Sequence, residues 1–211
     1  MRQPQDARRS AMYAYFIGPD GVFPSLLVAV LFLIMQLGFM ATESRRRRKA
    51  GASLARLSGL FPPLWLALLI GLIARLVCGF LKIGVIRGDI RDAVVWAGVL
   101  MVALGWGIRL WAQRKLGHYF VGEVAVQPGH AVVRDGPYRW VRHPAYAGGF
   151  LSSVGFALML STWLGALISA VILAWAYAVR VPREEALLVR ELGDAYRDYM
   201  AHTKRFVPFV F

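Results

Sequence analysis

The chain has 211 residues, of which 58% are hydrophobic and 18% are charged. A soluble domain carries about a quarter charged residues, and here the apolar residues are gathered into long blocks, so the composition predicts an integral membrane protein. In a soluble chain the net charge of +13 would indicate nucleic-acid binding. The basic residues flank the apolar blocks, however, so we expect no nucleic-acid partner. The single cysteine, Cys78, excludes an internal disulfide and a cysteine-rich metal site, and we expect no metal.

Membrane-spanning helices are predicted along most of the chain, because about 20 mostly apolar residues are needed to cross a hydrocarbon core of about 30 Å. Residues 22–41 contain no charge, and residues 60–81 and 93–112 contain one each. Residues 145–179 also contain no charge but are too long for one span. Ser161-Thr162 divides them, which favours a tight helical hairpin. We therefore predict an all-α membrane protein with about five transmembrane helices, the last two forming the hairpin.

The charges of the loops predict the orientation. Residues 43–58 hold the densest basic cluster, which places them in the cytosol. Alternation then puts the N-terminus, residues 82–92 and the hairpin tip outside, with residues 113–144 and the tail from Arg180 inside. No cleavage site follows a short apolar core near the N-terminus, so the first block is expected to be retained. The excess of arginine over lysine is typical of a GC-rich bacterial genome, and we expect a bacterial inner (plasma) membrane.

The chain is predicted to have two regions. Residues 1–112 would contribute three spans, and residues 113–211 would contribute a cytosolic loop, the hairpin and a C-terminal helix. Within residues 183–202 an apolar face recurs at helical spacing, formed by Leu188, Leu192, Tyr196 and Tyr199. This pattern fits either an interfacial helix lying on lipid headgroups or a helix packed over a site, and both readings stay open.

The most informative stretch is residues 116–149, LGHYFVGEVAVQPGHAVVRDGPYRWVRHPAYAGG. Its Pro-Gly and Asp-Gly-Pro turns leave residues 130–133 as an extended segment. Aromatic and basic residues then crowd just before a membrane helix. Arg139 and Trp140 fit a functional site, but they also fit the belt of aromatic and basic side chains that membrane proteins place at the depth of the lipid headgroups. Pro144 suits the first helical position, which leaves His143 near the N-cap, beside backbone N–H groups that bind anions.

A second group lies at the end of the last predicted span. Arg180 and Glu184 are four residues apart and share a helical face, with Glu185 directly following and Pro182 predicted to kink the helix. An ordinary salt bridge at a helix end and a functional pair at the membrane boundary are both consistent with this spacing.

Taken together, these motifs resemble the isoprenylcysteine carboxyl methyltransferase family, which is related to phospholipid methyltransferases. The resemblance rests on GPYRWVRHPAYAG, preceded by LGHYF and followed by R-x-x-x-E-E and LGD-x-Y-x-x-Y, and covers residues 111–208. It implies that the cytosolic loop and the last helices bind S-adenosylmethionine, and that a lipid-like or prenylated small-molecule acceptor enters from the bilayer.

The resemblance also implies roles for single residues. Arg180 is expected to bind the substrate and Glu184 the cofactor, and both are expected to be catalytic. Tyrosine faces and an acid suit the cations of S-adenosylmethionine, and His143 with helix N–H groups suits its carboxylate. Glu123 stands where eukaryotic members have glutamine, and Ala131 and Val132 also differ, which backbone contacts would tolerate. The expected cofactor-binding residues are Glu123, His130, Ala131, Val132, Val133, Tyr138, His143, Pro144, Ala145, Tyr146 and Glu184.

The expected function is methylation of a lipophilic acceptor at a carboxylate, as in isoprenylcysteine O-methylation. A carboxylate is already ionised at pH 7 and needs no general base, and Arg180 can clamp it with two hydrogen bonds. A phospholipid or amine N-methyltransferase would need a base that the motifs do not assign. A sterol-reductase-like NADPH enzyme is a further alternative, for which this chain is short. A non-catalytic protein on the same scaffold is disfavoured by the intact Arg180, Glu184 and His143.

Overall fold

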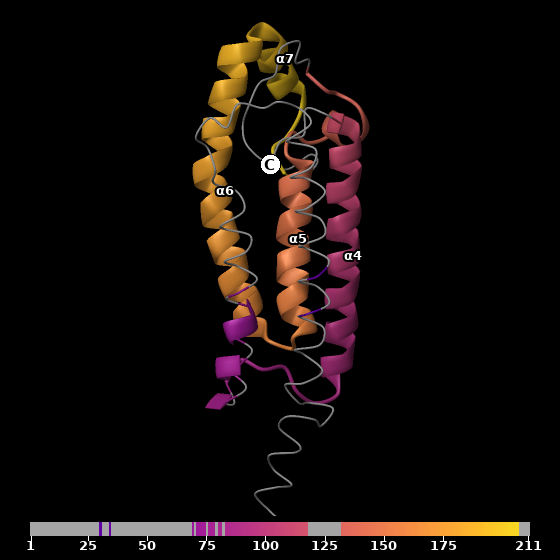
Figure 1. The fold of residues 1–211 in the computed structure, drawn as a ribbon, viewed down its shortest axis with the longest axis vertical. Coiled ribbons are helices and arrows are strands. Elements are labelled where there is room, and N and C mark those ends of the chain that lie inside the picture. The colour runs from indigo at the N-terminus through magenta and orange to yellow at the C-terminus, as the bar shows by residue number, and fades with distance from the viewer. Residues whose placement is uncertain are drawn as a thin grey trace, which may run out of the picture.

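The computed structural model describes residues 30, 34, 69, 71–74, 76–78, 80–81, 83–117 and 132–206. Within them lie α4 (Ile90–Leu116), the short 3-10 helix η2 (Gly136–Arg139), α5 (Pro144–Met159), α6 (Trp163–Leu192) and α7 (Asp194–His202). Helices α4, α5 and α6 stand side by side in alternating directions, and α7 lies at the end where α6 finishes (Figure 1). The described chain is therefore mostly helical, as predicted. Nearly all of the predicted span 22–41 and about half of span 60–81 lie outside the described residues.

Helix α4 contains the predicted span 93–112 and extends beyond it at both ends. Its first turn carries Asp92 and its last turn carries Arg114 and Lys115, which is the charge order that the helix dipole favours. Gly117 follows with a φ of 55°, a conformation that glycine adopts without steric cost, and the helix stops there.

The predicted hairpin between residues 145 and 179 is confirmed, with its turn at Ser161 and Thr162. Ser161 has a φ of 55°, and the Thr162 hydroxyl accepts a 3.1 Å hydrogen bond from Gly165 N, which caps α6. The turn is also tied to the residues before α4, because Ile86 N donates to Ser161 O at 2.8 Å and Trp163 N donates to Gly84 O at 3.1 Å. We call this end of the helices the hairpin end, and the other the α7 end.

The outward faces of α4 and α6 are apolar. Exposing such surface to water would cost about 25 cal/mol per Å², whereas hydrocarbon accepts it. In the part of the chain that the structure describes, α4 and α6 are also the two helices long and apolar enough to cross a membrane. The exposed side chains include Trp96, Leu100, Leu104 and Trp111 of α4 and Trp163, Leu167, Val171 and Trp175 of α6.

Helices α4 and α5 approach each other along paired glycines. A Cβ atom on Gly105 would lie 2.5 Å from the carbonyl oxygen of Gly148, and one on Gly98 would lie 2.6 Å from that of Gly155. The glycines are seven residues apart on each helix, which is about two turns, so they form one seam. Side chains at these positions would force the backbones apart, and small residues are what membrane helices use for such close packing.

The tail differs from the single helical pattern predicted for residues 183–202. Helix α6 continues through Pro182 to Leu192 and ends where Gly193 adopts a φ of 59°, and α7 begins at the next residue. The physical reason is that the positive φ of Gly193, which glycine adopts at little cost, is incompatible with the α-helix. The predicted apolar face nevertheless stays together and packs against the protein, in a cluster with Ala112 and Tyr138.

Candidate functional site

The motif residues meet at the α7 end, where the first turn of α5 faces the last part of α6. His143 is the N-cap of α5 and Pro144 its first residue, as the sequence predicted. The segment that follows α7, residues 203–206, runs alongside residues 140–143. Arg142 N donates to Lys204 O at 2.7 Å and His143 N donates to Arg205 O at 3.0 Å. This pairing brings the end of α7 to the start of α5.

Tyr146 joins the two residues that the sequence assigned to catalysis. Its hydroxyl donates to Glu184 Oε2 at 2.6 Å and accepts from Arg180 Nε at 2.9 Å. The tyrosine is buried and its ring meets Tyr177 edge-on, with ring centres 4.8 Å apart. Arg180 and Glu184 thus share a face of α6, as their spacing predicted, and a side chain of α5 fixes both.

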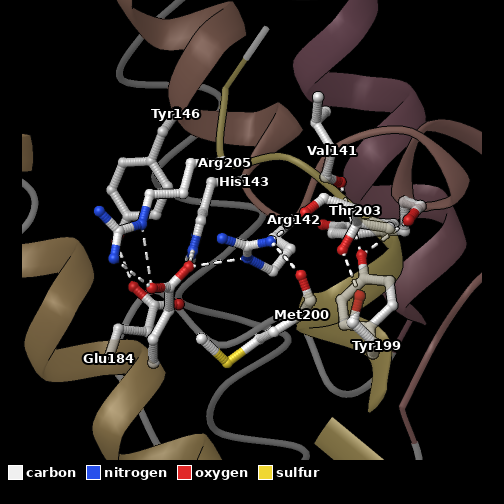
Figure 2. A network of polar contacts seen from close by, with 11 residues as sticks. Val141, Arg142, His143, Tyr146, Glu184, Tyr199, Met200, Thr203 and Arg205 are labelled. Atoms are coloured by element: carbon white, nitrogen blue, oxygen red, sulfur yellow. Dashed lines mark hydrogen bonds and ion pairs between the residues drawn. The ribbon is translucent and has the colours of Figure 1, made fainter. Parts of the chain in front are cut away.

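Glu185, the next residue on α6, is the centre of a second network of hydrogen bonds, whose donors Arg142, His143 and Arg205 are labelled in Figure 2. Its side chain is only 4% exposed and accepts hydrogen bonds on both oxygens. Arg142 Nε reaches Oε1 at 2.8 Å and His143 Nε2 lies 3.2 Å from the same atom, while Arg205 Nη2 reaches Oε2 at 2.9 Å. A carboxylate surrounded by such donors is held in its ionised form.

The contacts of His143 bear on its predicted role. Because the carboxylate of Glu185 is an acceptor, Nε2 of His143 carries the proton that points to it. In a neutral imidazole the other nitrogen is then an acceptor, which does not attract an anion. Binding of a cofactor carboxylate by His143 would therefore need the imidazolium form. The ring also packs edge-on against Tyr146, with centres 5.5 Å apart.

A third group surrounds Tyr138 in η2. The Tyr199 hydroxyl donates to Tyr138 O at 2.7 Å, and both rings belong to an apolar cluster with Val132, Val133 and Ala145. Burial raises the pKa of Tyr138 and of Tyr199, so both hydroxyls stay protonated donors. The neighbouring Tyr199 and the negative charge of Glu184 raise the pKa of Tyr138 further.

A surface ion pair ties the segment before η2 to α7. Arg134 Nη1 donates to Asp198 Oδ2 at 2.7 Å, and Arg134 Nη2 donates to Ala195 O at 2.9 Å. The hydrogen bond from Arg134 lowers the pKa of Asp198. Both contacts hold Val132 and Val133 against the helix that covers Tyr138.

Most of the sequence-predicted site residues that can be placed therefore lie in two neighbouring groups. Tyr146, Arg180 and Glu184 form one, and Val132, Val133, Tyr138 and Ala145 form the other, with His143 and Pro144 between them at the start of α5. Three predicted cofactor contacts, Glu123, His130 and Ala131, lie outside the described residues.

The sequence did not assign roles to several residues that the structure brings into the site. Arg142 and Glu185 stood inside the quoted motifs, so a signal was available for both. Arg205 and Phe206 follow the last helix and carried no signal, since their partners are 20 or more positions away.

Comparison with known proteins agrees with the motifs. The profile described as "Isoprenylcysteine carboxyl methyltransferase (ICMT) family" matches residues 98–190, which include η2, α5 and most of α4 and α6. This stretch of the chain is therefore similar to that family. The matched region contains Tyr146, Arg180 and Glu184, the residues joined by hydrogen bonds in the structure.

Curated proteins of similar sequence carry names from the same family. A protein-S-isoprenylcysteine O-methyltransferase of Schizosaccharomyces pombe is 29% identical over 69% of this chain and 67% of its own length. The protein-S-isoprenylcysteine O-methyltransferase A of Arabidopsis thaliana is 34% identical over 54% of this chain and 58% of its own length. That of Rattus norvegicus is 32% identical over 54% of this chain and 41% of its own length. The chain thus spans about two thirds or less of these relatives.

The fold of this chain is similar to that of a solved structure. That structure is titled as the eukaryotic intramembrane Ras methyltransferase ICMT, and it matches with a TM-score of 0.67 and 20% identity over 94% of this chain and 71% of its own. This likeness in fold and the apolar outer faces of α4 and α6 agree with the predicted membrane character of the chain.

Proposed function

We propose that this protein is a multi-pass membrane methyltransferase that uses S-adenosylmethionine to methylate the carboxylate of a lipophilic, isoprenylcysteine-like acceptor. The observation that carries the proposal is the Tyr146 hydroxyl, which holds an arginine and a glutamate together at the end of two membrane helices. The names of the curated relatives support the choice of a carboxyl acceptor over an amine.

The residues present fit S-adenosylmethionine. The cofactor bears a sulfonium, an ammonium and a carboxylate, and when bound it supplies an electrophilic methyl group. Glu184 offers a negative charge, and the buried rings of Tyr138 and Tyr146 offer faces that attract cations. Val132, Val133, Pro144 and Ala145 would contribute backbone and apolar contacts beside them, as would His143 through its ring. Glu123, His130 and Ala131 belong to the same proposal.

Arg180 is proposed to hold the acceptor. A guanidinium presents a planar fork of donors that matches the two oxygens of a carboxylate. Because the Arg180 Nε–H is already hydrogen-bonded to Tyr146, the plane of that fork is set before the acceptor arrives. Orientation of this kind can supply a large part of a rate enhancement. No general base is needed, because the attacking carboxylate is ionised at neutral pH.

The proposed topology has five spans, with the α7 end in the cytosol and the N-terminus outside, in a bacterial inner membrane. Charges of the described residues support this orientation. Basic side chains outnumber acids at the α7 end, whereas Arg87, Asp89, Arg91 and Asp92 balance at the hairpin end. Positive charge marks the cytosolic side. The exposed basic residues at the α7 end are Arg114, Lys115, Arg134, Arg139, Arg183, Arg190, Arg197 and Lys204.

A product assay tests the function. Purified protein is incubated with methyl-labelled S-adenosylmethionine and one of three acceptors: N-acetyl-S-farnesylcysteine, its carboxamide, or phosphatidylethanolamine. We expect label only with the free carboxylate, and mild alkali should release it as methanol because the product is an ester. Alkali-stable label on phosphatidylethanolamine would establish N-methylation instead. Oxidation of NADPH without any methyl transfer would indicate a reductase.

A further inference from the structure

We propose that residues 203–206, the segment after α7, position the catalytic side chains: Glu185 holds Arg205, and Phe206 then packs against the aromatic residues that fix Arg180. The proposal rests on the proposed function, since it concerns the same site. Arg205 and Phe206 act through Tyr146 and are positioning residues rather than catalytic ones.

The segment is attached to the start of α5 by its backbone. Val141 and Lys204 form a parallel bridge, and Lys204 N donates to Trp140 O at 3.2 Å. The Arg142 guanidinium adds hydrogen bonds to the carbonyl oxygens of Met200 and Thr203. The chain thus passes from α7 directly across the N-terminus of α5.

Glu185 connects this segment to α6. Its Oε2 atom accepts from both Nε and Nη2 of Arg205, at 3.1 and 2.9 Å, while Arg142 and His143 meet Oε1. Two charge-assisted hydrogen bonds from one guanidinium to the same oxygen are strong and fix the orientation of the Arg205 side chain. The Arg205 side chain is still 35% exposed, so replacing it leaves no large cavity.

Phe206 carries the effect into the site. Its ring lies 6.0 Å from that of His143 and stacks on Tyr177 at 6.3 Å between centres. It also packs on the apolar cluster that contains Tyr146. The ring of Tyr146 is in turn 4.8 Å from that of Tyr177, and its hydroxyl holds Arg180 and Glu184. A displaced Phe206 would therefore loosen the support of the Tyr146 ring.

Arg205→Gln tests the proposal, with Lys204→Gln as the matched control. Both variants remove one positive charge from the same segment, but Lys204 is exposed and pairs through its backbone. We expect Arg205→Gln to lower kcat/KM for the acceptor by about tenfold or more, because small misplacements of a catalytic group are costly. The kcat/KM of Lys204→Gln should stay within about twofold of the wild-type value. That of Arg205→Lys should lie between the values of Arg205→Gln and Lys204→Gln, since lysine keeps the charge but lacks the planar fork.

A double-mutant cycle separates positioning from general stability. In a Tyr146→Phe background the hydroxyl can no longer hold Arg180, so Arg205→Gln should cost much less there than in the wild-type protein. Equal losses in both backgrounds, or equal activity of Arg205→Gln and Lys204→Gln, would overturn the proposal. So would a loss that merely follows the unfolded fraction in a thermal melt.

Hydrogen exchange provides a readout that does not depend on the reaction. The amides of Tyr146 and Ala147 are bonded to His143 O in the first turn of α5. Arg205→Gln should speed their exchange and Lys204→Gln should not. If the wild-type protein transfers no methyl group, the proposed function fails, and unchanged exchange in Arg205→Gln would separately refute the positioning role.

Discussion

Glu184 and Glu185 are neighbours on α6 but have different partners. Successive residues of a helix point about 100° apart, so Glu184 reaches Tyr146 while Glu185 reaches Arg142, His143 and Arg205. The first carboxylate belongs to the proposed chemistry, and the second holds together three segments that are distant in sequence. The two residues should respond differently to substitution.

Glu185→Gln is expected to lower stability. The neutral amide leaves Arg142 and His143 buried without a negative partner, which costs about 3 kcal/mol or more. The midpoint of thermal unfolding in detergent should fall by several degrees. Glu191→Gln is the control, because Glu191 is exposed on the same helix and its ion pair with Arg190 is long, at 3.9 Å. A melting midpoint for Glu185→Gln equal to that of the control would contradict the assigned role.

Arg180 should be needed for turnover more than for folding. Arg180→Ala is expected to reduce kcat/KM by about 100-fold, because orientation and charge stabilisation of the acceptor are lost together. Arg180→Lys keeps the charge but not the fork, so a large loss there would establish the bidentate role. Arg183→Ala removes an exposed arginine from the same helix and serves as the control. Full activity of Arg180→Ala would remove the case for a carboxylate acceptor.

At the level of single residues, the placements that follow from spacing alone are confirmed. Arg180 and Glu184 are one helical turn apart, and His143 precedes a proline, so both placements followed from local geometry. Which of the two adjacent glutamates is buried depends on how α6 is rotated against α5, and no spacing reveals that. Arg205 contacts α6 only through tertiary structure, so its part in the site was not predictable.

At the scale of the elements, the glycine seam sets how closely α4 and α5 pack. The seven-residue spacing of Gly98 and Gly105, and of Gly148 and Gly155, was present in the sequence, but it does not say which helices pair. Gly193 was also visible inside a quoted motif, and it ends α6 where the periodicity alone suggested one continuous helix. A glycine after an apolar helical run is a stop signal.

Gly105→Ala should destabilise the protein, whereas Gly107→Ala should not. A Cβ on Gly105 meets backbone atoms of α5, and overpacking of this kind costs about 1–3 kcal/mol. A Cβ on Gly107 meets nothing within 4 Å, and alanine is the better helix former by about 1 kcal/mol. Thermal melts in one detergent compare the two. Equal midpoints would show that the seam is not tightly packed.

At the scale of the whole molecule, the distribution of charge predicts which end faces the cytosol. Single cysteines at Asp89 and Ala201, both exposed, report on the hairpin end and the α7 end. In a Cys78→Ala background, an impermeant thiol reagent should label Asp89→Cys in intact cells. It should label Ala201→Cys only after the membrane is opened. The reverse pattern would invert the proposed orientation.

The central claim is that the α7 end of α5 and α6 binds S-adenosylmethionine, and calorimetric titration of the purified protein tests it most directly. S-adenosylhomocysteine should bind and NADPH should not. Glu184→Gln should weaken the binding of S-adenosylhomocysteine by about 1–3 kcal/mol, the cost of losing a partly buried charge-assisted contact, while Arg183→Gln leaves the affinity unchanged. Binding of NADPH alone, or an unchanged affinity in folded Glu184→Gln protein, would contradict the account.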